Sequence, residues 1–415
     1  MNCFITKYNV DCPDGTDSVV LEDSIMHKGR HVTAGSKMLA NFVSPIDATV
    51  VKKLEAAGVR ILGKTKMTEF GIGGLFATSS ATQPPHHPSL QAPEAIQPPR
   101  PLSLSGAVTA VADGVANFAL CNDYTGAISQ EAAMHGLCYI HPTYGTVSRY
   151  GLIPTVTSMD QIGVVCKTPE EGFRALAIIT GYDEKDGAML PKMGEEIGAE
   201  RGEVRVDTGD AANSGLPTHR HNEAKDATMQ SKPQSDSLRI GVPVNVMTRF
   251  QNDTPIAVFT KAFTTVDFEL QHFEIYQQIM QILCCAELSN NISRYDGIKY
   301  GHRAGDYNGL RELYTKSRTE AFGADVKLAA MIGAMVLSQE NFTRYYDKAM
   351  RIRRLIKESL DFDKYDAIIA PTCLAALPLL CGLPAVTVPL HGGVTLIANA
   401  RREDVLQSIL KVVGI

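Results

Sequence analysis

The alternation of apolar and polar positions in residues 44–70 predicts a helix, a strand and a second helix. Apolar side chains recur at helical spacing across 48–57, directly after Asp47, a residue type that caps helix N-termini. A short strand is expected at 59–62, because this segment is apolar and contains β-branched side chains. A second capped helix is expected at about 65–69. The succession of helix and strand indicates a layered α/β architecture.

Later segments continue this pattern. Residues 108–120 predict a helix of small side chains leading toward a strand, and 366–371 has the composition of a buried strand ended by proline. A further strand is expected at 240–243, where a second half dominated by helices begins. The segment 275–291 is apolar over much of its surface, so we expect a largely buried helix there.

Two stretches interrupt the pattern. Residues 83–101 contain seven prolines, which predict an extended loop without a packed element of its own. Residues 193–236 are polar and almost free of large aliphatic side chains. Because they offer too little apolar surface to offset the entropy of ordering, we expect a disordered insertion. His219 and His221 lie in this insertion, where solvated histidines are a better explanation than a metal site.

Composition places the chain among ordinary globular proteins. Its 415 residues allow one large domain or two to three smaller ones, at roughly 150 residues each. The 44% apolar and 20% charged content excludes disordered, collagen-like and coiled-coil chains. No window approaches 18 uninterrupted apolar residues, so no membrane span is expected. The net charge of -5 gives no broad basic field, so contact with nucleic acid would be local or delivered by partners.

The nine cysteines form neither an even nor a dense disulfide framework. No Cys-x-x-Cys motif occurs, and the adjacent Cys284 and Cys285 lie in an apolar helical stretch. We expect reduced, mostly buried thiols, and neither a metal nor another cofactor. The start of the chain has the features of neither a secretory signal nor a transit peptide, so it does not indicate a compartment.

A series of short motifs extends from about Val19 to the C-terminus, apart from the insertion. These motifs are Thr33–Lys37, Asp47–Val51, Leu62–Thr65, Glu69–Phe70, His141–Gly145, Val147–Leu152, Ser158–Gly163, Ser293–Gly297 and Gly382–Val386. Together they resemble the amidase signature family, and within it the A subunits of glutamyl-tRNA(Gln) amidotransferases. For Thr33–Lys37 and 144–152, turn formation and sheet packing are a simpler explanation than a functional site.

The resemblance implies an α/β fold in three α/β/α layers, with a central mixed, mostly parallel sheet covered by helices. On this basis residues 19–415 form a single amidase-like domain, interrupted by the Pro-rich loop 83–101 and the insertion 193–236. Residues 1–18 are then an N-terminal arm.

The resemblance also implies a catalytic triad, and this chain departs from it. Family members use a nucleophilic Ser, a bridging Ser and a Lys that takes up the proton. Glu22 stands at the Lys position, Ser103 at the bridging position and Ala127 at the nucleophile. Ala127 follows Ser103 by 24 residues, as in the family pattern, which argues against a misalignment. A carboxylate cannot imitate an ammonium that donates three hydrogen bonds, so we expect no intact catalytic site.

Further family features are altered. Residues 328–333 replace a segment whose arginines include an anchor for a substrate carboxylate, and the substrate loop after Thr372 is shortened. Three side chains near Ala127 are candidate substitute nucleophiles, namely Cys121, Thr125 and Ser129. Each is displaced by two residues or more, whereas catalysis suffers from misplacements of about 1 Å. No substrate-binding residue is predicted.

These losses favour a pseudoenzyme, an inactive amidase-like protein that is a structural or scaffold subunit of a larger assembly. Association by family makes a mitochondrial translation complex, such as the mitochondrial ribosome, the first expectation, with other protein subunits and ribosomal RNA as partners. The alternative is a residual amidase, or an amidotransferase subunit of the A type, that hydrolyses glutamine or another amide. A third hypothesis is an inert scaffold that still pairs with the other amidotransferase subunits.

A basic helix is the candidate contact with RNA or an acidic partner. It is expected at about 340–360, and a solvated helix face is the simpler alternative. Its basic residues are Lys348, Arg351, Arg353, Arg354 and Lys357.

Overall fold

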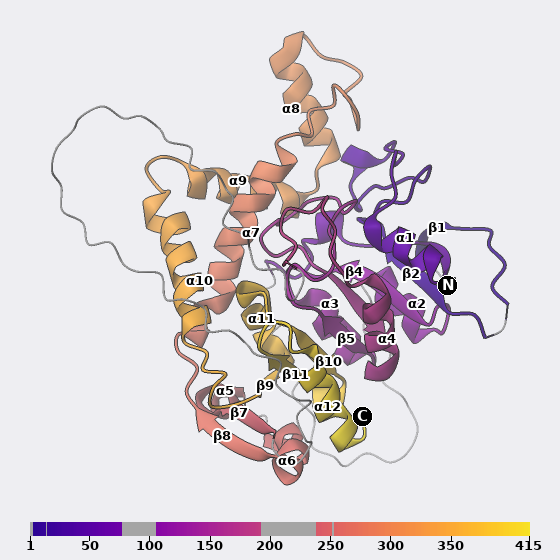
Figure 1. Ribbon diagram of the computed structural model, residues 1–415. Helices are drawn as coiled ribbons and strands as arrows, with labels where there is room; N and C mark the ends of the chain where they lie inside the picture. The colour runs from indigo at the N-terminus through magenta and orange to yellow at the C-terminus, as the bar shows by residue number, and fades with distance from the viewer. Residues whose placement is uncertain (1–2, 14, 77–104, 192–237, 251–252) are drawn as a thin grey trace, which may run out of the picture.

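The short apolar runs of the chain form the strands of one sheet. The computed structural model describes residues 3–13, 15–76, 105–191, 238–250 and 253–415. Eleven strands are found there: β1 Phe4–Lys7, β2 Ser18–Glu22, β3 Arg60–Thr65, β4 Phe118–Asn122, β5 Cys138–His141, β6 Ile162–Cys166, β7 Arg239–Pro243, β8 Thr264–Phe268, β9 Ala367–Pro371, β10 Ala385–Val388 and β11 Val394–Ala398. Their order is β1-β3-β2-β4-β6-β5-β10-β11-β9-β7-β8 (Figure 1). The first six strands of the sequence therefore form one half of the sheet, and the two halves meet where β5 pairs with β10.

The sheet is mixed, as predicted, but it is not mostly parallel. Parallel pairing is confined to two groups, β3-β2-β4 near one edge and β9-β7-β8 at the other. The remaining neighbours in the described sheet pair antiparallel. Both faces are covered, so antiparallel strands such as β6 and β11 are buried at every residue. Their mostly apolar sequence therefore did not distinguish them from parallel strands.

Helices cover both faces of the sheet and make three layers. Along β2, Val19 and Leu21 enter one hydrophobic cluster and Val20 enters another on the opposite face. The first face is covered by α1 Thr49–Ala56, α4 Pro169–Ile179, α6 Asp253–Ala262 and α12 Glu403–Val413. The opposite face is covered by α2 Gly106–Ala112, α3 Ala127–Met134, α7 Tyr276–Ile292, α9 Ala324–Leu337, α10 Lys348–Glu358 and α11 Ala376–Cys381. The α/β/α architecture is confirmed.

The remaining described elements are short or peripheral. Two further helices are α5 Val244–Phe250, beside β7 and β9, and α8 Gly309–Ala321, which projects from the body of the molecule (Figure 1). Single turns of 3-10 helix occur at Lys37–Leu39, Glu69–Gly71, Phe273–Ile275, Thr372–Leu374 and Leu390–Gly392, and a π-helical turn at Thr343–Asp347 leads into α10.

Most of the predicted elements are confirmed. The predicted helix at 48–57 is α1, but its N-cap is Ala48, because the Asp47 carboxylate instead accepts the Lys28 N–H at 2.7 Å. The helix expected at about 65–69 is wrong. There, β3 continues to Thr65 because it pairs with both β1 and β2, and a single 3-10 turn follows.

Several other predictions can be placed. The segments 108–120, 240–243, 275–291 and 366–371 correspond to α2 with β4, to β7, to α7 and to β9. The residues predicted as an N-terminal arm contribute β1, which pairs with β3 at the edge of the sheet. The Pro-rich loop 83–101 and the insertion 193–236, with His219 and His221, lie outside the described residues.

The cysteines are free thiols, as predicted. All nine are described; seven are buried, Cys373 is half-buried and Cys12 is exposed. No described helix has both the length and the apolar character needed to cross a bilayer.

Candidate active site

Glu22, at the position that the resemblance assigns to lysine, is the last residue of β2 and is 2% exposed. Ser24 donates a hydrogen bond to its Oε1 at 2.6 Å. Burial raises the pKa of Glu22 to about 8, although the Ser24 hydrogen bond opposes this shift. The group is therefore a neutral, buried carboxylic acid at pH 7, which has neither the charge nor the donors of a lysine.

A buried lysine lies beside this carboxyl group. Lys64 on β3 is fully buried and donates to the main-chain carbonyl groups of Glu22, at 3.1 Å, and Ile25. Its Nζ is 3.9 Å from Oδ1 of Asp23, and burial lowers the pKa of Lys64 to about 8. Lys64 thus holds the turn after β2 in place. Sequence reasoning missed this role, although a lysine inside an apolar strand was the available signal.

Ala127, at the nucleophile position, is the first residue of α3 and is half-buried. The turn before it needs glycine at 126, because φ is 79° and a Cβ there would lie 2.4 Å from that of Ala375. A Cβ added at Gly74 would lie 3.0 Å from the Ala127 Cβ. A side chain at Gly74 would therefore crowd Ala127, and the methyl group of Ala127 has no nucleophilic atom.

The main-chain N–H groups of this turn are already hydrogen-bonded. Asp123 accepts the N–H of Gly126 at 2.8 Å and that of Ser129 at 2.9 Å, while Thr125 Oγ1 accepts the N–H of Ala127 at 3.3 Å. An oxyanion hole needs N–H groups directed at the developing charge of the substrate. Here Asp123 and Thr125 take up these donors, so the turn does not present them to a ligand.

The three substitute nucleophiles are committed elsewhere. Ser129 donates to the Gly126 carbonyl oxygen at 3.0 Å, and Thr125 donates to that of Gly73 at 3.1 Å. Cys121 is fully buried, and burial raises its pKa well above the usual range, so its thiol is un-ionised. Ser129 has the carboxylate of Asp123 in hydrogen-bond contact, and this carboxylate interacts with the Ser129 side chain as well as with the main chain of the turn.

Ser129 also borders a small internal cavity of about 20 Å³. All of its lining residues are buried. A space of this size accommodates about one water molecule and excludes an amide substrate. The bridging position, Ser103, lies outside the described residues, so its contacts do not enter this account.

Comparison with known proteins identifies the family. A family model described as Amidase matches residues 18–384, which is most of the chain. The chain belongs to the amidase family. The A subunit of glutamyl-tRNA(Gln) amidotransferase from Lachnoclostridium phytofermentans is 35% identical over 371 residues, covering 88% of this chain and 69% of that protein. The corresponding protein from Ralstonia nicotianae is 37% identical, covering 84% of this chain and 68% of its own length.

Solved structures of amidase-like proteins share the fold. The crystal structure of the A subunit of glutamyl-tRNA(Gln) amidotransferase from Thermotoga maritima has a TM-score of 0.66 and 23% identity, covering 99% of this chain and 86% of that one. Peptide amidase from Stenotrophomonas maltophilia has a TM-score of 0.65 and 21% identity, covering 96% and 82%. The resemblance seen in the sequence motifs, and the fold it implied, are therefore confirmed.

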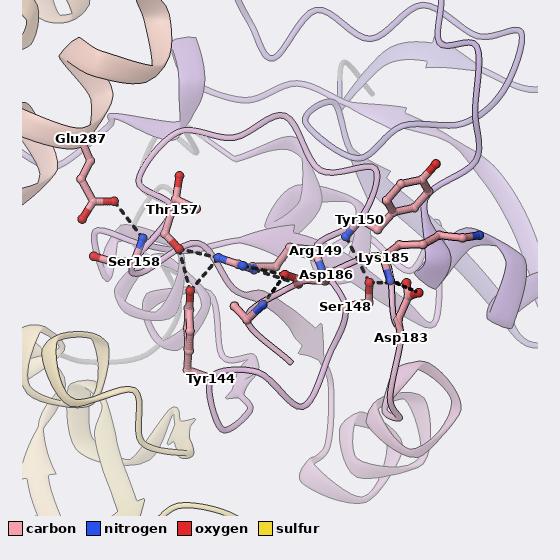
Figure 2. Close-up of polar contacts among 11 residues, drawn as sticks. Tyr144, Ser148, Arg149, Tyr150, Thr157, Ser158, Asp183, Lys185, Asp186 and Glu287 are labelled. Carbon is pink, nitrogen blue, oxygen red and sulfur yellow. Dashed lines mark hydrogen bonds and ion pairs between the residues drawn. The ribbon is translucent and has the colours of Figure 1, made fainter. Parts of the chain in front are cut away.

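Segment 144–152, which is retained from the amidase family, makes a network of hydrogen bonds with neighbouring loops. Arg149 donates to both carboxylate oxygens of Asp186, at 2.7 and 3.0 Å, and to the Tyr144 hydroxyl at 2.7 Å (Figure 2). Burial raises the pKa of Asp186, but the hydrogen bonds from Arg149 more than offset this and hold it below the usual range. Ser148 in turn donates to Asp183 at 2.7 Å. These contacts hold the segment that follows α4, which contains Asp183 and Asp186, against segment 144–152. This is the packing role expected for segment 144–152.

The segment Thr33–Lys37 is likewise used for packing. Thr33 donates its N–H and its hydroxyl to Asp23, and Ser36 donates to Glu69 Oε1 at 2.6 Å. The other Glu69 oxygen accepts the N–H of Gly323 at 2.8 Å. The motif therefore joins the turn after β2 to the start of α9.

The segment that replaces the substrate-binding arginines lies on α9. Leu328 and Met331 are 40% and 65% exposed, and residues 328–333 contain no guanidinium group. Packing of α9 against α7 is close at Gly333, where a Cβ would lie 2.1 Å from the Cys285 carbonyl oxygen. The shortened substrate loop forms a 3-10 turn and α11.

The basic residues of α10 do not share one surface. Arg353 points inward, donating to the Leu380 carbonyl oxygen at 2.6 Å and to Ser158 at 2.8 and 3.0 Å. Arg351 pairs with Asp347, and Arg354 with Glu358. Lys348 and Lys357 are exposed. Arg353 thus holds the loop before β6 and lies apart from the other four basic residues, while their contact with RNA or an acidic partner stays a prediction.

Proposed function

We propose that this chain is a catalytically inactive member of the amidase family that is a structural subunit of a protein assembly. One observation carries the inactivity: around Ala127, the turn donates its main-chain N–H groups to Asp123 and Thr125. The chain therefore lacks the nucleophile, and it also lacks free N–H donors that would stabilise a tetrahedral intermediate. The neutral Glu22, held by Ser24, supplies no base in place of the lysine.

The scaffold role is supported by α9. This helix is apolar almost all round, yet Leu328, Met331 and Met335 are 40%, 65% and 47% exposed. Apolar surface of this kind marks sites of protein contact. The relatives are named as subunits, which supports an assembly of proteins. The ion pairs of Arg351 and Arg354 reduce the basic character of α10, so a protein partner is favoured over RNA. A mitochondrial location, with the mitochondrial ribosome as host, stays a prediction.

Inactivity is tested with the purified, folded full chain. Ammonia release from glutamine and from a simple aliphatic amide is measured, with an active amidase-family enzyme as the positive control. We expect no release above the buffer rate. Turnover that disappears in Ser129→Ala or Thr125→Ala, but not in the exposed control Ser359→Ala, would establish the alternative, a residual amidase with a relocated nucleophile.

The assembly is tested by gradient sedimentation of the tagged protein from its own cells, with and without ribonuclease. We expect migration as a particle larger than the 45.0 kDa monomer, unchanged by ribonuclease. A ribosome-sized particle that ribonuclease disperses would support the ribonucleoprotein hypothesis instead. Migration as the monomer in both conditions would rule out the scaffold role.

A further inference from the structure

Lys64 and Asp23 form a buried pair at the ends of two neighbouring strands. Lys64 lies on β3, and Asp23 directly follows β2, which pairs with β3 in parallel. Both side chains are 0% exposed, and Nζ of Lys64 is 3.9 Å from Oδ1 of Asp23. Because this distance is too long for a hydrogen bond, the two groups are adjacent but not bonded to each other. An amine and a carboxyl group thus lie together where water is excluded.

The hydrogen bonds of Lys64 leave one position of its nitrogen unused. Nζ donates to the main-chain carbonyl oxygens of Glu22, at 3.1 Å, and Ile25. An ammonium group has three N–H donors, and the third has no acceptor among the described residues, which is unfavourable for a buried charge. A neutral amine has two N–H donors and a lone pair, so it matches the two bonds observed. Burial lowers the pKa of Lys64 to about 8, which raises the fraction of the neutral form.

The two carboxyl oxygens of Asp23 have different surroundings. Oδ2 accepts the N–H of Thr33 at 2.8 Å and also its hydroxyl, whereas Oδ1 accepts no hydrogen bond from the described residues. Two donors on one oxygen of a carboxyl group stabilise the negative charge that develops there in a tetrahedral intermediate. Burial raises the pKa of Asp23, although Lys64 and Thr33 oppose this shift. The arrangement therefore favours attack on Cγ, with Oδ1 as the oxygen that leaves.

We propose that Lys64 and Asp23 condense into an isopeptide bond that joins β3 to the turn after β2. Nζ of Lys64 forms a bond to Cγ of Asp23, and the bond between Cγ and Oδ1 breaks. In total the ammonium group gives up two protons, which leave with Oδ1 as one water molecule. Oδ2 becomes the amide carbonyl oxygen and keeps its hydrogen bonds from Thr33. The step changes no oxidation state and requires no further reactant.

The fold supplies the driving force for this reaction. Lys64 and Asp23 are held next to each other in one molecule, which gives them a high effective concentration. Condensation also replaces a buried ion pair, whose desolvation is costly, by a neutral amide. Reacting atoms are in position at about 3–3.5 Å, so the side chains must approach further before attack. We therefore expect the bond to form after folding and to accumulate with time.

Mass spectrometry of the purified full chain tests the proposal directly. After incubation of the folded protein and denaturation, we expect an intact mass lower than that of the sequence by one water molecule. Proteolytic mapping should then show the peptide that contains Lys64 linked to the peptide that contains Asp23. An intact mass equal to that of the sequence would overturn the proposal. Loss of water within the Asp23 peptide alone would also overturn it, because that result identifies a cyclic imide instead of a cross-link.

Two substitutions assign the bond to its residues. Lys64→Arg and Asp23→Ala should each restore the full mass of the variant sequence. The control is Lys53→Arg, since Lys53 is a half-buried lysine that also donates to main-chain carbonyl oxygens, and this variant should keep the loss of water. Loss of water that persists in Lys64→Arg would overturn the proposal. The linked peptide of the wild type decides the question if either variant fails to fold.

Discussion

Ser24 donates a 2.6 Å hydrogen bond to the carboxyl group of Glu22, and both side chains are buried at the end of β2. The pair replaces an ammonium group with a neutral acid held by a hydroxyl. Such a pair is a stable structural unit with no base function at neutral pH.

The stability of the protein is expected to depend on the protonation of Glu22. Its folded pKa is about 8 against the usual 4.5, so the folded state binds the proton more tightly than the unfolded state does. The resulting stabilisation is complete below pH 4.5 and is lost as the pH rises to about 8. Glu22→Gln removes this dependence, and the difference in the free energy of unfolding between pH 5 and pH 8 should shrink by up to about 4 kcal/mol.

Urea unfolding of the wild type and Glu22→Gln at both pH values measures this effect. The exposed control Glu184→Gln should behave as the wild type. Buried Asp23 and Asp123 also have raised pKa values, so some decline with pH should remain in Glu22→Gln. An identical pH dependence in the variant and the wild type would contradict a raised pKa at Glu22.

Restoring the nucleophile alone should not restore hydrolysis. In Ala127→Ser the new hydroxyl has no base, and the turn still donates its N–H groups to Asp123 and Thr125. We expect no ammonia release from glutamine in this variant, nor in the double variant Ala127→Ser with Glu22→Lys. Measurable turnover in the single variant would mean that the rest of the catalytic machinery is intact.

Two arginines on α10 should differ sharply in their effect on stability. Arg353→Ala removes hydrogen bonds to Ser158 and the Leu380 carbonyl oxygen and should cost about 2–4 kcal/mol. Arg351, whose side chain is 75% exposed, makes only a surface pair with Asp347, and its replacement by Ala should cost at most about 1 kcal/mol. Chemical denaturation of the two variants measures the contrast. Equal losses would place Arg353 on the surface.

Acid should weaken the contact between Arg149 and Asp186. The pKa of Asp186 is lowered in the folded state, so its contribution is present above about pH 4 and is lost as the pH falls further. Asp186→Asn should cost about 3–5 kcal/mol at pH 7, because it leaves the largely buried Arg149 guanidinium without its counter-charge. Denaturation at pH 7 and pH 3 tests this, and the penalty should be smaller at pH 3. A penalty that grows toward low pH would contradict the lowered pKa.

The sequence predicted the elements better than their pairing. Apolar runs located β7, β9 and α7, because a buried continuous segment is apolar in its own local sequence. Strand direction leaves no such trace where both faces are covered, so the largely antiparallel centre was missed. Likewise, Thr65 is a residue type that is common at helix N-termini, but here it pairs with Glu22 of β2 and is therefore part of strand β3.

For the candidate site, the sequence predicted which residues occupy the key positions, but it did not predict their hydrogen bonds. The replacements at Glu22 and Ala127 follow from the resemblance of the surrounding motifs to the amidase family. That Asp123 and Thr125 bond the N–H groups of the turn depends on side-chain rotation, which the sequence does not specify. Arg353 is an intermediate case. It lies two positions after Arg351, about 200° around the helix, and this spacing was a sign that it faces the core.

The junction of β5 and β10 has a consequence for how the chain folds. His141 pairs with Ala385, so the sheet is completed only when residues far apart in the sequence meet. Closing such a long loop is slow, and until it closes β5 is an edge strand with unpaired main-chain groups. During synthesis, the first half of the sheet must wait for most of the chain to leave the ribosome. We expect this interval to be the time at which the protein is most exposed to aggregation and to chaperone binding.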